Sequence, residues 1–134
     1  MILLDTHVLY WMANESKRLS QRAREAIRKA TQEQERHSAG IAAATITVWE
    51  LAWLAENGRI TVTGSVESFV RETVARVILR PVTPEIAALA VTLPERFPKD
   101  PADRLIAATA MAEGMALVTA DTRIRRSKVV ETIW

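Results

Sequence analysis

Short apolar runs alternate with longer amphipathic stretches along this chain, and the pattern predicts strands alternating with helices. The apolar runs lie near residues 2–5, 40–44, 77–82, 115–119 and 129–133. They lack the strict polar alternation of a half-exposed strand, which is typical of strands covered on both faces. Helices are predicted between them, near 20–34, 47–57, 65–77, 84–93 and 101–112, with a short one after residue 5. We therefore expect an α/β domain with a mostly parallel sheet.

Length and composition narrow the kinds of site that the chain can hold. Its 134 residues, 49% hydrophobic and 25% charged, fit one globular domain over residues 1–134. The absence of cysteine excludes disulfides, thiolate metal sites and cysteine nucleophiles, and two histidines, His7 and His37, exclude a histidine-rich metal site. A net charge of +2 permits an anionic partner without requiring one.

The charge pattern also argues against a membrane protein. The longest stretch without a charged side chain runs from His37 to Trp49, short of the roughly 18 residues of a membrane span. The first residues, Met1–Leu4 followed by Asp5, lack the basic region of a signal peptide. With no cysteine as well, we expect a cytoplasmic protein.

Four acidic residues lie at the ends of predicted strands or near the starts of predicted helices. Asp5 closes the first strand, Glu50 lies one turn into the helix after the second, and Asp121 follows the fourth. Asp103 lies in the first turn of the helix that begins at Pro101. Ligands of open parallel sheets bind beyond the carboxyl ends of the strands, so we expect these four side chains to meet there.

Each acid also fits a purely structural role. Thr47 and Glu50 have the spacing of a capping box, Asp100 is placed to cap the helix at Pro101, and Asp5 and Asp121 could each cap a turn or helix. Together, however, clustered carboxylates repel one another by about 1 kcal/mol per close pair. A cation relieves that repulsion, and a set of hard oxygen ligands suits Mg²⁺ or Mn²⁺.

Four segments resemble a known family. Leu3–Leu9 followed by Trp11 is similar to the opening of PIN-domain ribonucleases, especially VapC-type toxins of toxin–antitoxin pairs. Ile46–Ala52, Asp100–Ala108 and Leu117–Asp121 resemble the later motifs, in the same order, so the resemblance covers essentially the whole chain. Ala102 stands where an aromatic residue is common and Thr109 where glutamine is common. These departures bear on substrate contacts or packing rather than on metal chemistry.

The resemblance implies a three-layer α/β/α sandwich with a mostly parallel central sheet and a metal-dependent endoribonuclease activity. It makes Asp5 the central ligand of Mg²⁺ or Mn²⁺, with Asp103 and Asp121 completing the set and Glu50 assisting the metal or the water. Thr6 and Thr119 would hydrogen-bond the ligating carboxylates. We expect Asp100 to cap the helix and to support Asp103.

The resemblance also implies a reaction and partners. RNA phosphodiesters would be hydrolysed without a covalent intermediate, by water that the cation has made more acidic. The activity would be held in check by a cognate antitoxin protein, and the protein would form a homodimer.

Other residues have weaker signals. We expect a structural role for His7, because consecutive residues at a strand–helix turn point in different directions, and an exposed loop position for His37. Trp49 and Trp53 lie four apart on one predicted helix, which favours core packing, with a groove for a partner helix as the alternative.

Two segments are rich in basic residues. Those between 17 and 36 indicate a solvated helix face, or else contact with the RNA backbone. Those between 123 and 128 follow Asp121 directly, so contact with RNA or antitoxin is more credible there.

Two other classes remain open. A phosphatase with an aspartyl nucleophile would open with Asp-x-Asp, and His7 at the third position argues against it. A non-catalytic binding module would keep the acids as helix caps only.

Overall fold

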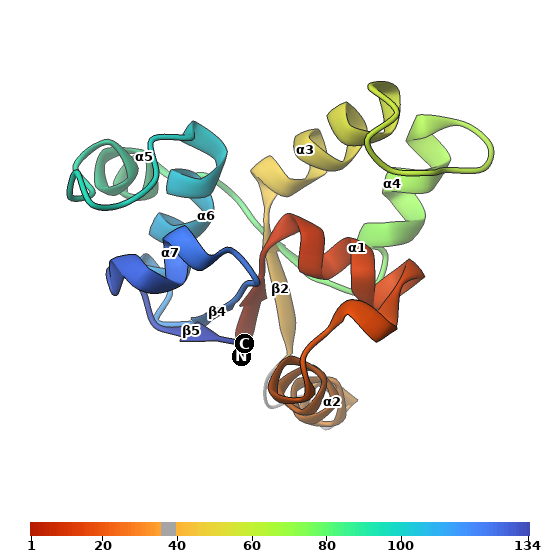
Figure 1. The fold of residues 1–134 in the computed structure, drawn as a ribbon, viewed down its shortest axis with the longest axis horizontal. Coiled ribbons are helices and arrows are strands. Elements are labelled where there is room, and N and C mark those ends of the chain that lie inside the picture. The colour runs from red at the N-terminus through yellow and green to blue at the C-terminus, as the bar shows by residue number, and fades with distance from the viewer. Residues whose placement is uncertain (36–39) are drawn as a thin grey trace.

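The chain folds as a three-layer α/β/α sandwich (Figure 1) in the computed structural model, which describes residues 1–35 and 40–134. The central sheet has five parallel strands in the order β3-β2-β1-β4-β5. The strands are β1 (Ile2–Leu4), β2 (Ile41–Ala44), β3 (Ile78–Arg80), β4 (Ala116–Val118) and β5 (Thr132–Ile133). This arrangement confirms the fold class predicted from the sequence.

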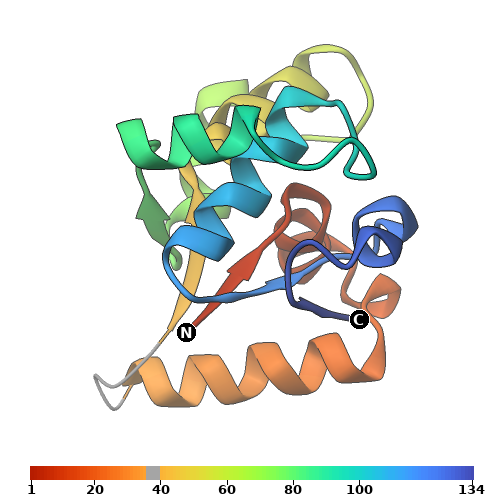
Figure 2. The same ribbon diagram turned by 90° about the vertical axis from the view of Figure 1, so that its left-hand side faces the viewer.

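Seven α-helices in the described residues cover the two faces of this sheet. They are α1 (Thr6–Asn14), α2 (Gln21–Glu35), α3 (Thr45–Glu56), α4 (Val66–Val74), α5 (Pro84–Val91), α6 (Pro101–Ala112) and α7 (Thr122–Ser127). A 3₁₀ turn, Ser16–Arg18, follows α1. The views in Figures 1 and 2 place α2 at the end of the molecule opposite α3 and α5.

Alternate residues of the strands face opposite layers, and each side forms its own core. Leu4 and Val118 pack with side chains of α1, α2, α3 and α4. Leu3 and Leu117, their neighbours in the chain, pack with α6, α7 and the segment after α5. Burial on both faces explains why these strands are apolar throughout rather than alternating with polar residues.

The register of β1 determines which residues meet at the carboxyl edge of the sheet. Leu3 is paired with Ala42 of β2 on one side and with Leu117 of β4 on the other. Leu4 is paired with Val118, so the residues that follow, Asp5 and Thr119, leave the sheet side by side. This edge therefore gathers residues that are more than a hundred positions apart in the chain.

Several boundaries differ from the prediction. α3 begins at Thr45, two residues early, α4 ends at Val74, and β5 is shorter than expected. α7 was not predicted as a helix, because its six residues are too few to show a helical period. His37 lies outside the described residues. Within residues 1–35 and 40–134, none of the helices is both long enough and apolar enough to cross a bilayer.

Candidate active site

Asp5 is the most buried acidic residue at the carboxyl edge of the sheet, with 8% of its surface exposed. It is the N-cap of α1, and its Oδ1 accepts a hydrogen bond from the Thr6 backbone N–H at 2.8 Å. Its Oδ2 accepts one from the Thr119 hydroxyl at 2.7 Å. Both carboxylate oxygens are therefore held in place by donors from β1–α1 and from the end of β4.

A second group of hydrogen bonds links α1 to α3. The Thr6 hydroxyl donates to Oε1 of Glu50 at 2.6 Å and lies 3.1 Å from the Thr47 hydroxyl. The capping box expected for Thr47 and Glu50 is not formed, because α3 starts at Thr45 and its N-cap is Ala44. Thr47 is instead a fully buried residue in the first turn, and Glu50 faces Thr6 across the interface.

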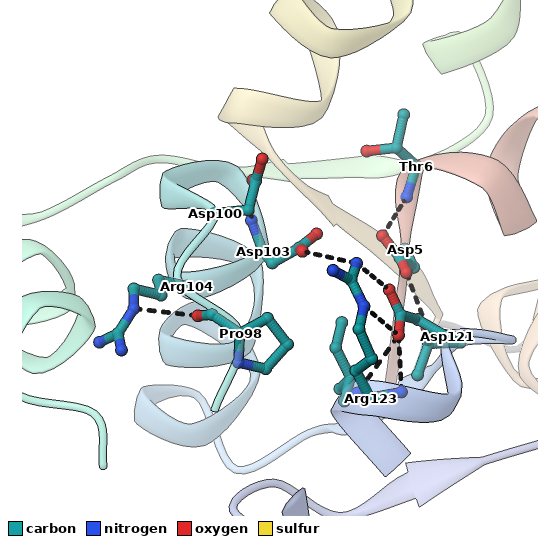
Figure 3. Close-up of polar contacts among 10 residues, drawn as sticks. Asp5, Thr6, Pro98, Asp100, Asp103, Arg104, Asp121 and Arg123 are labelled. Carbon is teal, nitrogen blue, oxygen red and sulfur yellow. Dashed lines mark hydrogen bonds and ion pairs between the residues drawn. The ribbon is translucent and has the colours of Figure 1, made fainter. Parts of the chain in front are cut away.

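The N-terminus of α6 brings a further pair of carboxylates. Oδ1 of Asp100 accepts a hydrogen bond from the Asp103 backbone N–H at 3.0 Å, so Asp100 is the N-cap of α6. Pro101 occupies the first helical position, where its missing N–H costs nothing. Asp103 lies one turn in, and its carboxylate is directed toward Asp121 and Arg123 (Figure 3).

Asp121 has two roles in the structure. Its Oδ1 accepts hydrogen bonds from the backbone N–H groups of Arg123 and Ile124, which makes it the N-cap of α7. Its Oδ2 pairs with the Arg123 guanidinium at 2.9 Å. The same guanidinium lies 3.8 Å from Oδ2 of Asp103, so Arg123 bridges the two aspartates (Figure 3).

One cavity of about 490 Å³ is lined by all four predicted ligands and by Asp100; we call it the acidic cavity. Its remaining lining comes from His7, Trp11, Arg18, Ala120 and Arg123. The structure therefore brings Asp5, Glu50, Asp103 and Asp121 together. In the described part of the chain, however, no group of three or more histidine or acidic side chains is arranged as it stands to hold a metal ion. Many of their oxygens face protein donors instead, Arg123 among them.

Burial and the crowding of negative charge raise the pKa values of three acids in this cavity. Burial, followed by the charges of Asp5 and Asp100, raises the pKa of Asp103 to about 7. Burial also raises the pKa of Asp5 and of Glu50, although hydrogen bonds from threonine hydroxyls oppose both shifts. These acids would release their protons more readily if a cation were nearby.

Asp121 behaves in the opposite way. Burial alone would raise its pKa, but the hydrogen bonds from Arg123 and from the N-terminus of α7 lower it overall. The pairing in turn raises the pKa of the Arg123 side chain. The pKa of Asp121 is therefore lowered, whereas the pKa values of Asp5, Glu50 and Asp103 are raised.

Comparisons with known proteins identify the family of this chain. A family model described as the PIN domain matches residues 2–129. The chain belongs to the PIN-domain family. It is 44% identical over 135 residues to Ribonuclease VapC22 of Mycobacterium tuberculosis (strain ATCC 25618 / H37Rv), with 99% of this chain and 98% of that one covered.

Solved structures with lower sequence identity share the fold of this PIN domain. One is VapBC2 from Rickettsia felis bound to a DNA fragment from their promoter, with a TM-score of 0.69 at 18% identity over 98% of this chain and 97% of that one. Another is DNA-bound VapBC from Salmonella typhimurium, with a TM-score of 0.68 at 19% identity and the same coverage. At these identities the likeness concerns the fold alone.

Trp49, Trp53 and His7 of this PIN domain lie outside its core. Trp49 and Trp53 are 59% and 44% exposed, so the prediction of core packing was wrong for both. With His7 they line an adjoining cavity of about 350 Å³. His7 is itself exposed, borders the acidic cavity and lies 5.9 Å from the Trp11 ring, so it is not a core residue.

Sequence reasoning missed two residues of this site. Arg123 was grouped with the basic residues that follow Asp121, although its spacing of two from that acid placed it within reach of the carboxylate. Thr47 was assigned to a helix cap rather than to contact with Thr6. No local pattern in the sequence reveals that contact, because it joins residues 41 positions apart.

Proposed function

We propose that this PIN-domain protein is a metal-dependent endoribonuclease that hydrolyses RNA phosphodiester bonds and is the toxin of a toxin–antitoxin pair. The observation that carries the proposal is the gathering of Asp5, Glu50, Asp103 and Asp121 around one cavity. The chain is 44% identical over nearly its whole length to a protein named as a ribonuclease, which supports the reaction class.

The acidic cavity suits Mg²⁺ or Mn²⁺. Its donors are carboxylate oxygens, which these hard cations prefer. Burial, and after it the charges of the neighbouring acids, raises the pKa of Asp103 to about 7, and the nearest cation is the Arg123 guanidinium at 3.8 Å. We assign Asp5, Asp103 and Asp121 as the ligands, with Glu50 beside them. When bound, such a cation lowers the pKa of water and stabilises negative charge on phosphate.

The protein's own residues prepare the site for this chemistry. Thr6 and Thr119 hold the Asp5 carboxylate in a single orientation from opposite sides. The Thr6 hydroxyl also fixes Oε1 of Glu50. Oε2 of Glu50 accepts no hydrogen bond from the residues that the structure describes. We propose that this free oxygen orients the attacking water or accepts its proton.

The partners belong to the same proposal. The solved structures with this fold include VapBC assemblies and a toxin–antitoxin complex from Klebsiella pneumoniae, which supports an antitoxin as partner. The exposed Trp49 and Trp53 on α3 and Val91 on α5 provide apolar surface for an antitoxin or for a second copy in a homodimer. A cytoplasmic location agrees with the lack of cysteine.

The substitution Asp5→Asn tests the proposed activity, because it keeps the side-chain shape and removes the central negative charge. We expect RNA cleavage in the presence of Mn²⁺ to fall by about 100-fold or more, with the far-UV circular dichroism spectrum unchanged. Glu67→Gln is the matched control, since this exposed acid on α4 lies outside the acidic cavity. Cleavage that survives Asp5→Asn, or that persists in excess EDTA, would contradict the assignment.

One observation favours a second candidate, a binding module without catalysis. Asp5, Asp100 and Asp121 all cap helices, which accounts for three acids without any metal. Calorimetric titration separates the two functions. Asp103 caps no helix. Mn²⁺ binding with an affinity that depends on Asp103 would support the nuclease, whereas the absence of measurable Mn²⁺ binding would support the binding module.

A further inference from the structure

We propose that a second cavity, which adjoins the acidic cavity and is lined by Arg18 and Arg59, binds a phosphodiester of the RNA strand next to the bond that is cleaved. The inference rests on the proposed ribonuclease function and names where its substrate lies. The cavity has a volume of about 280 Å³ and is formed by α1, the turn after it and the segment after α3. We call it the basic cavity.

The two cavities are neighbours that share part of their lining. His7, Trp11 and Arg18 line both of them, so an extended strand can pass from one to the other over these three side chains. Every nucleotide of a strand adds a phosphate charge, about 3.4 Å further along the axis of a duplex. A strand with one phosphate at the carboxylates therefore presents neighbouring phosphates to the cavity that shares their wall.

The charges of the two cavities are opposite. The acidic cavity has five carboxylates against Arg18 and Arg123. The basic cavity has Arg18 and Arg59 against the single carboxylate of Glu15. Nucleic-acid affinity comes largely from cationic side chains on phosphates, and a group of carboxylates by itself repels the strand. The basic cavity supplies the attraction that the acidic cavity lacks.

Arg18 is held in position before any ligand binds. Its guanidinium carbon lies 4.5 Å from the centre of the Trp11 ring, and one of its nitrogens is 3.3 Å from a carboxylate oxygen of Glu15. Trp11 is in turn packed against the rings of His7 and Trp134. The Arg18 side chain remains 60% exposed, so several of its five N–H donors still face solvent.

Arg59 is positioned by the backbone at the end of α3. Gly58 adopts a φ of +64°, and its N–H bonds to the carbonyl of Ala55 while the Arg59 N–H bonds to that of Leu54. These two bonds form a Schellman motif, which turns the chain back at this point. Within the residues that the structure describes, Arg59 has no ion-pair partner. The Arg59 guanidinium can therefore pair with an anion.

The basic surface of α2 is less suited to this role. Arg22, Arg28 and Lys29 of α2 gather with Glu25 around a separate cavity. None of the residues that line it lines the acidic cavity. A strand bound there would not lead directly to the carboxylates, which is why we assign the phosphate to Arg18 and Arg59.

Salt-dependent binding tests the proposal without relying on cleavage. The probe is a fluorescein-labelled 12-nucleotide polyuridine, and its Kd is measured by anisotropy between 50 and 200 mM NaCl on Asp5→Asn protein, which prevents turnover. In this background we expect Arg59→Ala or Arg18→Ala to weaken binding by about three- to fivefold at the lowest salt. Each should also reduce the slope of log Kd against log salt by about 0.7, the value for one phosphate contact on a single strand.

Two further variants separate phosphate binding from general effects. Arg59→Lys keeps the charge and should retain the slope, and Arg28→Ala removes a charge from α2 and should leave both Kd and slope unchanged. An unchanged slope in Arg59→Ala and Arg18→Ala would overturn the proposal and leave the basic cavity for acidic side chains of a protein partner. An equal loss in Arg28→Ala, or no binding by the parent protein, would also overturn it.

The nuclease function is tested separately, by cleavage with the unsubstituted protein and Mn²⁺. A slope that depends on Arg59 in a protein that cleaves no RNA would refute the nuclease and keep the phosphate site. Cleavage with an Arg59-independent slope would refute the phosphate site and keep the nuclease.

Discussion

At the scale of single residues, the site combines carboxylates, which are costly to bury, with hydrogen-bond donors that stabilise them. Asp5 is buried with a raised pKa, yet hydrogen bonds from Thr6 and Thr119 keep its two oxygens satisfied. Among the residues that the structure describes, the Asp103 carboxylate has no comparable set of donors, and its one ion pair is with Arg123 at 3.8 Å. With a pKa raised to about 7, Asp103 therefore changes its charge state near neutral pH.

The raised pKa of Asp103 predicts a pH dependence of stability. An unfolded aspartate has a pKa near 3.8 and the folded one a pKa of about 7, so the folded state binds the proton more tightly. The contribution of this group to stability is complete below pH 3.8 and is lost as the pH rises toward 7. We expect Asp103→Asn, measured at pH 7.5 without divalent metal, to raise the Tm by about 4 °C, or roughly 1 kcal/mol after discounting for partial exposure.

The same variant at low pH provides the control. Near pH 4 the folded Asp103 is already protonated, so Asp103→Asn should change the Tm there much less than at pH 7.5. Asp100→Asn keeps the cap and removes a neighbouring charge, so it should also stabilise at pH 7.5, by a smaller amount. A Tm difference for Asp103→Asn that is the same at both pH values would show that its charge does not destabilise the fold.

At the scale of secondary-structure elements, helix N-termini place the acids. Asp5, Asp100 and Asp121 cap α1, α6 and α7, and Asp103 lies in the first turn of α6. Such positions favour carboxylates because the helix dipole and the free N–H groups stabilise negative charge. Local helix formation and the assembly of the site thus depend on the same residues.

Asp121 allows the two roles to be separated. Asp121→Asn keeps a side-chain oxygen that can accept from Arg123 and Ile124, whereas Asp121→Ala removes the cap of α7. We expect Asp121→Ala to lower the free energy of unfolding by about 1 kcal/mol and Asp121→Asn to lower it much less. Both variants should lose RNA cleavage, because both lack the charge assigned to metal binding.

Urea denaturation and a cleavage assay on the same preparations check this prediction. Ser65→Ala is the matched control, since Ser65 caps α4 by accepting from the Ser68 N–H and lies outside the acidic cavity. It should lose stability and keep activity. If Asp121→Asn cleaves RNA as the unsubstituted protein does, Asp121 is a cap only.

The elements also show how far the sequence alone could lead. Strand ends can be located from short apolar runs, and parallel strands share one edge, so the meeting of Asp5 and Asp121 near that edge was predictable. The start of α3 was not, because Thr45 and Thr47 both have side chains that suit an N-cap, whereas the structure places the N-cap at Ala44, which has no capping side chain. The bridge from Arg123 to Asp103 was also beyond the pattern, since it depends on how α6 and α7 pack.

At the scale of the whole molecule, the acidic cavity joins parts of the chain that belong to different layers. α1 and α3 pack mainly on one face of the sheet, and α6 and α7 on the other. Each of these four helices contributes an acidic residue or its cap to the cavity. A cation bound there would hold the two layers together at the carboxyl edge of the sheet.

This position predicts that a divalent metal stabilises the fold as a whole. A ligand that binds only the folded state adds about 2.7 kcal/mol at a hundred times its Kd, which corresponds to about 10 °C in Tm for a domain of this size. We expect Mn²⁺ to produce an increase of this order in the unsubstituted protein, and EDTA to reverse it. In Asp5→Asn the increase in Tm should be largely lost. Glu113 is paired with Arg80 away from the acidic cavity, so Glu113→Gln should retain the increase.

The increase in Tm should also depend on pH. Because protonation competes with metal for the same carboxylate oxygens, it should be smaller at pH 5.5 than at pH 7.5. A Tm that does not respond to Mn²⁺ at either pH would mean that the carboxylates repel one another without a cation to relieve them, and the proposed metal site would be wrong.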